Sequence, residues 1–206
     1  MAFPPTGIRA VLFDIYGTLL DGPRHADRQQ RMEEVANRFG LPTDFRIDLA
    51  FDRAVATSHE ESPHPHPEVD VREIWATIFP GLQDPDRFSL AMEEAVHPVS
   101  VLPEGELMFR QAIDSGLAVG FVTNAQAYTR ILLQRHFPGL WNASRPDLMA
   151  FSYEHRISKP DLRLFRVPLK RLHEEGIRDH EVLMVGDSEE NDIRPARRIG
   201  LRTHRI

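Results

Sequence analysis

Short apolar runs alternate with amphipathic segments through the second half of the chain, and this alternation limits the possible folds more than any other feature. Strands are predicted at 117–122, 149–152, 181–185 and 201–204, and helices at 103–115, 125–136, 161–175 and 189–199. A further apolar run at 9–14 predicts a first strand. Strands that alternate with helices form a parallel sheet with helices on its faces. The chain therefore predicts an α/β fold with a doubly wound parallel sheet.

The segment between the first strand and the rest has a different character. Residues 24–39, 44–59, 71–79 and 86–96 have the apolar spacing of helices, and the stretch EESPHPHPEVD must be a loop. No convincing strand is present between them. We therefore predict an α/β core domain made of residues 1–22 and 99–206, with residues 23–98 inserted as a small all-helical domain, called here the helical insertion.

Charge and composition exclude several classes of function. The 206-residue chain has a formal net charge of −6, whereas nucleic-acid-binding proteins normally carry a basic face. It has no cysteine, which excludes thiolate metal sites and cysteine nucleophiles. No apolar run is long enough to span a membrane, and MAFPPTGIRA lacks the pattern of a secretion signal. We expect a cytoplasmic protein that acts on a small molecule, without nucleic-acid or membrane partners; no feature indicates its oligomeric state.

Carboxylates stand where two of the predicted strands end. Asp14 ends the first strand, Asp187 follows the strand at 181–185, and Asp192 comes five residues later. In an open parallel sheet, ligands bind beyond the carboxyl ends of the strands. Three carboxylates close together repel one another unless a cation lies among them, and magnesium is the hard divalent ion that prefers oxygen ligands. The sequence therefore predicts a magnesium site at this edge.

Groups that bind anions follow the other strands. Thr123 and Asn124 come directly after the strand at 117–122, and Lys159 precedes Pro160 at the start of another helix. Thr123 offers a hydroxyl, nearby backbone amides can donate to an anion, and Lys159 offers a mobile positive charge. A carboxylate, magnesium, a lysine and a hydroxyl are the parts that phosphoryl transfer through an aspartyl-phosphate requires.

With these residues in view, the sequence resembles the haloacid dehalogenase (HAD) superfamily. Four motifs occur in the expected order: FDIYGTLL, FVTNA, ISKPDLRLF and VLMVGDSEENDI. The resemblance runs from about Arg9 to the C-terminus. It implies a Rossmann-like HAD core, and residues 23–98 resemble the helical cap that this superfamily inserts after the first strand.

The resemblance also implies a role for each motif residue. Asp14 would be the nucleophile. Thr123 and Asn124 would bind the transferring group, and Lys159 would neutralise both that group and the nucleophile. Magnesium would be held by Asp14, the backbone carbonyl of Tyr16, Asp187 and Asp192.

Tyr16 departs from the phosphatase pattern of the superfamily. Phosphatases usually carry a second Asp two residues after the nucleophile, which protonates the leaving oxygen and later activates water. General acid–base help of that kind contributes about 10²- to 10⁴-fold. A tyrosine, with a reference pKa of about 10, is a poor general base at neutral pH.

Two alternatives therefore stand beside a magnesium-dependent phosphatase of small phosphorylated metabolites. The 2-haloacid dehalogenases resemble this first motif because they too carry a tyrosine there, and a halide leaves without a proton. They work without metal, however, and their last motif lacks the Gly-Asp that this chain has at Gly186 and Asp187. The other alternative is a catalytically weak binding protein with the HAD fold.

Plainer explanations exist for some of these residues. Thr123 could cap the following helix, and Tyr16 could serve packing alone. Asp187 and Asp192 could be acidic residues at a helix N-terminus, where the helix dipole favours them. In the helical insertion, His59, Glu60, Glu61 and Arg72 are candidate substrate contacts that the sequence does not rank. We interpret His64 and His66 as part of a solvated loop rather than as a transition-metal site.

Overall fold

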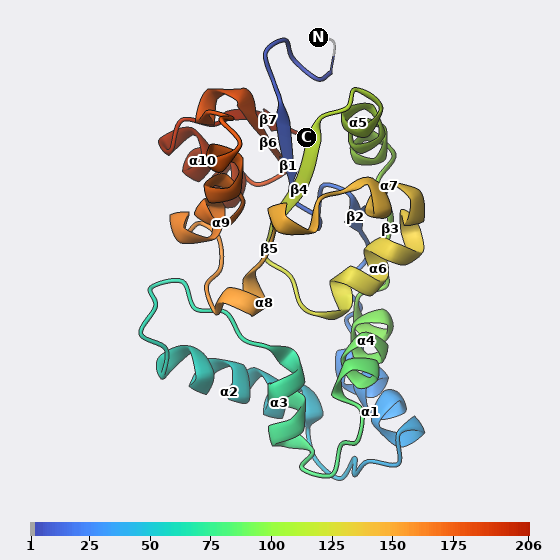
Figure 1. Cartoon of the computed structure of the whole chain (residues 1–206). Helices are drawn as coiled ribbons and strands as arrows, with labels where there is room; N and C mark the ends of the chain where they lie inside the picture. Colours follow the sequence, from blue (N-terminus) through green and yellow to red (C-terminus); the bar gives the residue numbers. More distant parts are fainter. Residues whose placement is uncertain (1–2) are drawn as a thin grey trace.

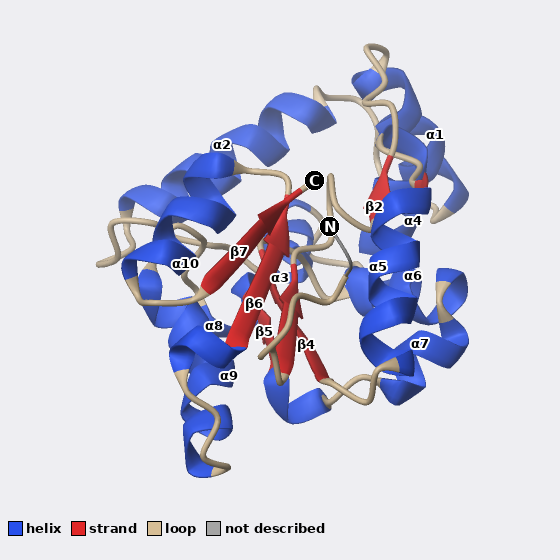
Figure 2. Cartoon of the chain, turned by 90° about the horizontal axis from the view of Figure 1, so that it is seen from above, coloured by secondary structure: helices blue, strands red, loops and turns tan. Residues whose placement is uncertain are grey.

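The computed structural model describes residues 3–206, and its central element is a sheet of five parallel strands (Figure 1 and Figure 2). In spatial order the strands are β5 (Met149–Phe151), β4 (Ala118–Thr123), β1 (Ala10–Phe13), β6 (Val182–Gly186) and β7 (Arg202–Arg205). The chain moves outward from β1 to β4 and β5 on one side, and then continues to β6 and β7 on the other. This order confirms the predicted doubly wound sheet.

The register of the sheet brings three strand ends together. Phe13 of β1 pairs with Phe121 of β4 on one side and with Val185 of β6 on the other. The residues that follow these strands therefore leave the sheet at one edge, beside the point where the strand order reverses. Such an edge is where open α/β sheets bind ligands.

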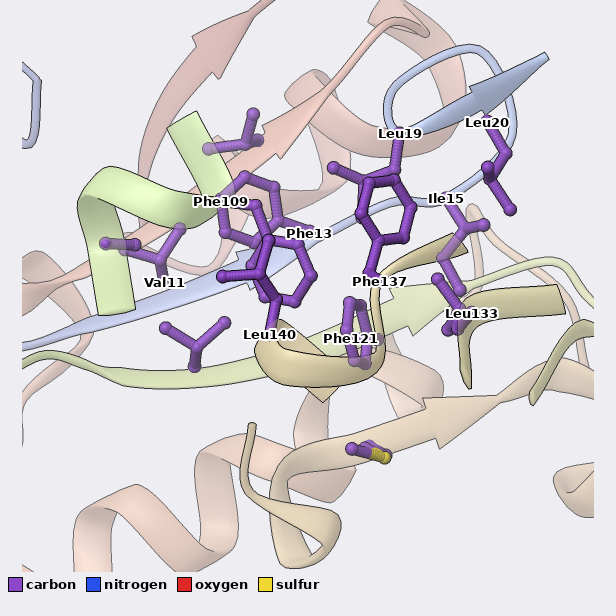
Figure 3. Packing of buried hydrophobic residues seen from close by; sticks show 14 of the residues in the cluster. Val11, Phe13, Ile15, Leu19, Leu20, Phe109, Phe121, Leu133, Phe137 and Leu140 are labelled. Carbon is purple, nitrogen blue, oxygen red and sulfur yellow. The ribbon is translucent and has the colours of Figure 1, made fainter. Parts of the chain in front are cut away.

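Helices cover both faces of the sheet because the side chains of β1 alternate between them. Val11 and Phe13 belong to one apolar cluster, in which the rings of Phe13, Phe109 and Phe121 meet (Figure 3). The helices on this face are α5 (Pro103–Asp114), α6 (Tyr128–His136) and α7 (Pro138–Ala143). Ala10 and Leu12 face the opposite cluster, which is covered by α9 (Leu162–Glu174) and α10 (Arg194–Arg198).

The four helices of the helical insertion enclose an apolar cluster of their own. They are α1 (Arg28–Arg38), α2 (Ile47–Glu60), α3 (Val71–Ile78) and α4 (Pro85–Val96), drawn at the bottom of Figure 1. Trp75, Phe79 and Phe88 are buried at its centre. This separate cluster supports the proposal that residues 23–98 form a domain distinct from the α/β core. Within residues 3–206, no helix has both the length and the apolar character needed to cross a membrane.

Several short elements were absent from the sequence prediction. Strands β2 (Leu20–Asp21) and β3 (Ser100–Val101) pair antiparallel where the chain leaves and re-enters the core, and two residues are too few to show a period. The helix predicted at 189–199 is present, but its first five residues, Glu189–Ile193, form a π-helical turn that precedes α10. Helix α8 (Ser152–His155) and the 3₁₀ turns at Pro146–Leu148 and Asp179–Glu181 were also missed.

Candidate active site

Asp14 is the first residue beyond β1, and its carboxylate is largely buried. Its backbone N–H donates to the carbonyl oxygen of Val185 at 2.9 Å, which extends the pairing with β6 by one step. Its Oδ1 lies 2.7 Å from the Nζ of Lys159. The Asp14 carboxylate, which is 7% exposed, is therefore a buried charge paired with a cation at this edge of the sheet.

Lys159 lies between two carboxylates. Its Nζ is 2.7 Å from Asp14 Oδ1 and 2.5 Å from Asp192 Oδ1, and its side chain is 2% exposed. Burial alone would lower the pKa of Lys159, but the charges of Asp14 and Asp192 raise it above its ordinary value. The lysine is therefore a fixed cation beside Asp14.

Asn124 holds Lys159 in place through the backbone. Its side-chain Oδ1 accepts a hydrogen bond from the Lys159 backbone N–H at 2.7 Å, and its Nδ2 donates to the Lys159 carbonyl oxygen at 3.2 Å. The sequence predicted Asn124 only as an anion-binding residue. This reciprocal pair adds a positioning contact that links the end of β4 to the lysine.

Three carboxylates converge at the same edge. Asp14, Asp187 and Asp192 each offer an oxygen, and these oxygens all lie within 4.8 Å of one another. Burial and the charge of Asp14 raise the pKa of Asp187, and burial raises the pKa of Asp192 to about 6 despite the neighbouring Lys159. Mutual repulsion of this kind is relieved by a cation, and an all-oxygen donor set fits a hard divalent ion.

Two glycines allow this close approach. Gly17 has a φ of +79°, and a Cβ built on it would lie 2.7 Å from the Asp187 carboxyl carbon. A Cβ on Gly186 would overlap the Asp192 carboxylate. Both glycines therefore leave the space in which the carboxylates meet.

We expect Gly186→Ala to destabilise the protein by about 1–3 kcal/mol, because the added methyl group must displace Asp192 or the backbone. The displacement also separates Asp192 from the other carboxylates, so magnesium binding should weaken tenfold or more. Urea unfolding and calorimetric titration with Mg²⁺ measure the two effects.

Gly139→Ala is the matched control for this substitution. Gly139 lies in α7, and nothing is within 4 Å of a Cβ built on it. Since alanine favours a helix over glycine by about 1 kcal/mol, this variant should be as stable as the parent or more so. Equal Mg²⁺ affinity in the Gly186→Ala variant and the parent would contradict the assignment of Asp192 to the cation site.

Thr123 ends β4 with its side chain fully buried. Within the part of the chain that the structure describes, its Oγ1 has no hydrogen-bond partner. An unpaired buried hydroxyl costs free energy, and an anion oxygen could supply the missing partner. The unpartnered hydroxyl therefore supports the prediction that Thr123 binds the transferring group.

Tyr16 is held by contacts that do not involve Asp14. Its hydroxyl is 3.0 Å from Thr129 Oγ1 of α6, and its ring centroid lies 5.9 Å from that of His97. Burial and the charge of Glu93 raise the pKa of Tyr16 well above its ordinary value. The tyrosine therefore stays protonated at neutral pH and is unsuited to act as a general base.

A cavity of about 210 Å³ lies next to these residues, and we call it the charged cavity. It is lined by Tyr16, Arg24, Glu68, Glu93, His97, Asn124, Ala125, Gln126 and Tyr128. A second cavity, of about 420 Å³, shares several of these residues and extends among the helices of the insertion.

The residues of the insertion named as candidate substrate contacts lie outside the charged cavity. They are His59, Glu60, Glu61 and Arg72, of which Arg72 pairs with Asp70 and Asp86. The proline-rich loop contributes Glu68, a residue that no sequence motif marked. His64 and His66 belong to no group of metal-ligating side chains among residues 3–206.

Comparisons with known proteins identify the family to which the sequence is similar. Residues 8–200 match the family described as haloacid dehalogenase-like hydrolase. A curated phosphoserine phosphatase from Thermus thermophilus is 36% identical over 100 residues, a match that spans 48% of this chain and 38% of that relative.

Solved structures agree on the fold. A HAD phosphatase from Thermococcus onnurineus has a TM-score of 0.63 at 22% identity, covering 97% of this chain and 86% of that one. A 2-haloacid dehalogenase from Pseudomonas syringae has a TM-score of 0.66 at 19% identity, covering 95% and 85%. Phosphatase and dehalogenase thus share this fold, so the fold alone does not choose between the two reactions. The family match over residues 8–200 means that this chain belongs to the haloacid dehalogenase-like hydrolases.

Proposed function

We propose that the protein is a magnesium-dependent phosphatase that hydrolyses a small phosphorylated metabolite through an aspartyl-phosphate on Asp14. The observation that carries this proposal is that Asp14, Asp187 and Asp192 offer oxygens within 4.8 Å of one another, beside a buried lysine that pairs with Asp14 and Asp192. The negative charge of three ionised carboxylates exceeds the positive charge of one lysine, and a bound divalent cation would neutralise the excess. The partial match to a relative named phosphoserine phosphatase also supports phosphate as the group transferred.

The proposed reaction has two steps. In the first, a carboxylate oxygen of Asp14 attacks phosphorus, and the bond from phosphorus to the ester oxygen breaks as that oxygen leaves with the electron pair and takes up a proton from water. In the second, water attacks the phosphorus of the aspartyl-phosphate, releasing phosphate and restoring the Asp14 carboxylate. Lys159 and Thr123 would hold the phosphoryl oxygens during both steps.

The donor set fits the metal that this proposal requires. Asp14, Asp187, Asp192 and the backbone carbonyl of Tyr16 would hold magnesium, and a carbonyl ligand does not depend on the side chain at that position. When bound, the ion supplies positive charge that offsets the negative charge of the nucleophile and the phosphoryl group.

Dehalogenation is the second candidate, and Tyr16 is the observation that favours it. A halide needs no proton as it leaves, so the loss of an acid at this position would have no consequence. Asp187 argues against this reaction, because in a metal-free site three carboxylates would share the single positive charge of Lys159. A catalytically weak binding protein with the HAD fold is the third candidate, which an absence of turnover would favour.

Removal of divalent cations separates these functions. We expect phosphate release from p-nitrophenyl phosphate in the presence of Mg²⁺, loss of at least 90% of that activity in EDTA, and recovery when Mg²⁺ is restored. Release of chloride from 2-chloropropionate that persists in EDTA would identify a dehalogenase instead. No turnover of either compound, or of a broad panel of phosphate esters, would favour a binding protein.

A further inference from the structure

The charged cavity lies between residues that follow β1 and β4 in the core and residues of the helical insertion. Tyr16 and Asn124, which line it, are near neighbours in sequence of Asp14 and Thr123, and Arg24, Glu68 and Glu93 contribute charges from the insertion. We propose that this cavity binds the leaving group and selects a zwitterionic alcohol, one that carries both an ammonium and a carboxylate group. This inference rests on the proposed phosphatase function and names the substrate class for the same site.

Glu68 is a partly buried carboxylate whose hydrogen-bond partners are all neutral. It accepts hydrogen bonds from Ser152 Oγ at 2.7 Å, from the Val69 backbone N–H at 2.9 Å and from Gln126 Nε2 at 3.3 Å. It forms no ion pair with any residue in 3–206, and burial raises its pKa. The nearby Arg156 pairs with Glu73 instead, at 2.5 Å. An ammonium group in the cavity would supply the missing positive charge.

Glu93, the other carboxylate of the cavity, already has its partners. One of its oxygens lies 3.0 Å from Nδ1 of His97, and the other accepts a hydrogen bond from the Tyr128 hydroxyl at 2.9 Å. Glu93 therefore lies against an imidazole with which it forms an ion pair when that ring is protonated. Glu68 has only neutral hydrogen-bond partners, so it is the carboxylate of the cavity that lacks a cationic partner among residues 3–206.

Arg24 supplies the opposite charge. Its side chain is exposed and lines both the charged cavity and the adjoining larger one. Among the residues that the structure describes, it has neither an ion pair nor a side-chain hydrogen bond. A guanidinium is always charged, and its planar donors match a carboxylate in a bidentate pair. A substrate carboxylate is the complementary group.

The two charges together define the selectivity. A leaving group that carries only a carboxylate could pair with Arg24, but its negative charge would lie near Glu68, which has no ion-pair partner. A leaving group with an ammonium alone would satisfy Glu68 and leave Arg24 without a partner. Each missing charged group leaves Glu68 or Arg24 without its partner, so its loss should reduce kcat/KM about 10- to 100-fold.

Three matched phosphate esters test this selectivity in the parent protein with Mg²⁺. O-Phosphoserine carries both groups, 3-phosphoglycerate replaces the ammonium by a hydroxyl, and O-phosphoethanolamine lacks the carboxylate. We expect kcat/KM for O-phosphoserine to exceed that for each of the other two by about 10- to 100-fold. p-Nitrophenyl phosphate, which needs neither charge, tests the proposed phosphatase function separately.

Two isosteric or near-isosteric variants assign the preference to residues. Glu68→Gln should bring the kcat/KM ratio of O-phosphoserine to 3-phosphoglycerate close to one, and Arg24→Gln should do so for the ratio to O-phosphoethanolamine. Glu61→Gln and Arg53→Gln are the matched controls, since both residues are exposed and lie outside the charged cavity. Both controls should keep the parent ratios. If Glu68→Gln fails to fold, the preference of the parent and the effect of Arg24→Gln still decide the question.

The failures of the two proposals differ. Magnesium-dependent hydrolysis of the aryl phosphate with equal kcat/KM for all three esters would overturn the zwitterion proposal and leave the phosphatase function standing. If the aryl phosphate is not hydrolysed, calorimetry with the Asp14→Asn variant, Mg²⁺ and each ester decides the matter. Tighter binding of O-phosphoserine, lost when Glu68→Gln is added, would support the cavity; equal or absent binding would overturn it.

Discussion

Asp14→Asn is expected to reduce phosphate release by at least about 10⁴-fold while the fold is retained. An amide oxygen is neutral and a poor nucleophile, so no aspartyl-phosphate can form. The fold should survive because Lys159 keeps Asp192 as a partner at 2.5 Å, and no buried cation is left alone. Initial rates with p-nitrophenyl phosphate and Mg²⁺ measure the loss, and near-UV circular dichroism measures the fold.

The same substitution at an exposed aspartate controls for the change of charge. Asp114 lies at the end of α5, is exposed and has no ion pair among residues 3–206, so Asp114→Asn should keep the parent rate within about twofold. Activity of the Asp14→Asn variant at the level of this control would show that the nucleophile is another group.

Tyr16→Asp is expected to raise the rate of hydrolysis of alkyl phosphates about 100-fold, within the range for general acid–base catalysis. Burial and Glu93, which raise the pKa of Tyr16, would also raise the pKa of a carboxyl group at that position. A carboxyl group with a raised pKa is protonated more often, and in that form it could donate its proton to the leaving oxygen. The ratio of alkyl- to aryl-phosphate hydrolysis is the measurement, since nitrophenolate leaves without a proton.

Tyr16→Phe separates the acid from the loss of the phenol. It removes the hydroxyl bonded to Thr129 but keeps the ring beside His97, so the alkyl-to-aryl ratio should not change. The lost hydrogen bond should cost about 1 kcal/mol of stability, visible in urea unfolding. A Tyr16→Asp variant with an unchanged or lower ratio would mean that another group already protonates the leaving oxygen.

The α/β core was predictable because its signals are local. The apolar runs of β1, β4 and β6 were each located to within about one residue, since a buried parallel strand reads as an unbroken apolar segment. The proximity of Asp14, Asp187 and Asp192 was also predictable from the sequence, because residues that follow neighbouring parallel strands lie at the same edge of the sheet. Their roles, and the division into domains, stay predictions.

The contacts between core and insertion were not predictable in this way. Gln126 donates to the Val69 carbonyl oxygen and accepts from the Val71 N–H, both at 3.0 Å, across more than 50 residues of chain. No period or motif marks such a pair, since a single polar residue in a loop looks the same whether it is solvated or buried. The same is true of Glu68, which meets Ser152 from 84 positions away.

The insertion is anchored to the core at a point far from its two connecting strands. Pro67 and Ile157 form an antiparallel bridge, the Glu68 N–H donates to the Arg156 carbonyl oxygen at 3.1 Å, and Gln126 binds the backbone on either side of Asp70. Glu68, which is proposed to bind the substrate ammonium group, therefore belongs to the loop that connects the insertion to the core. Replacing the insertion by that of a relative would remove both the substrate contact and these core contacts. A substitution at Glu68 would therefore change the contacts with Gln126 and Ser152 together with the proposed substrate preference.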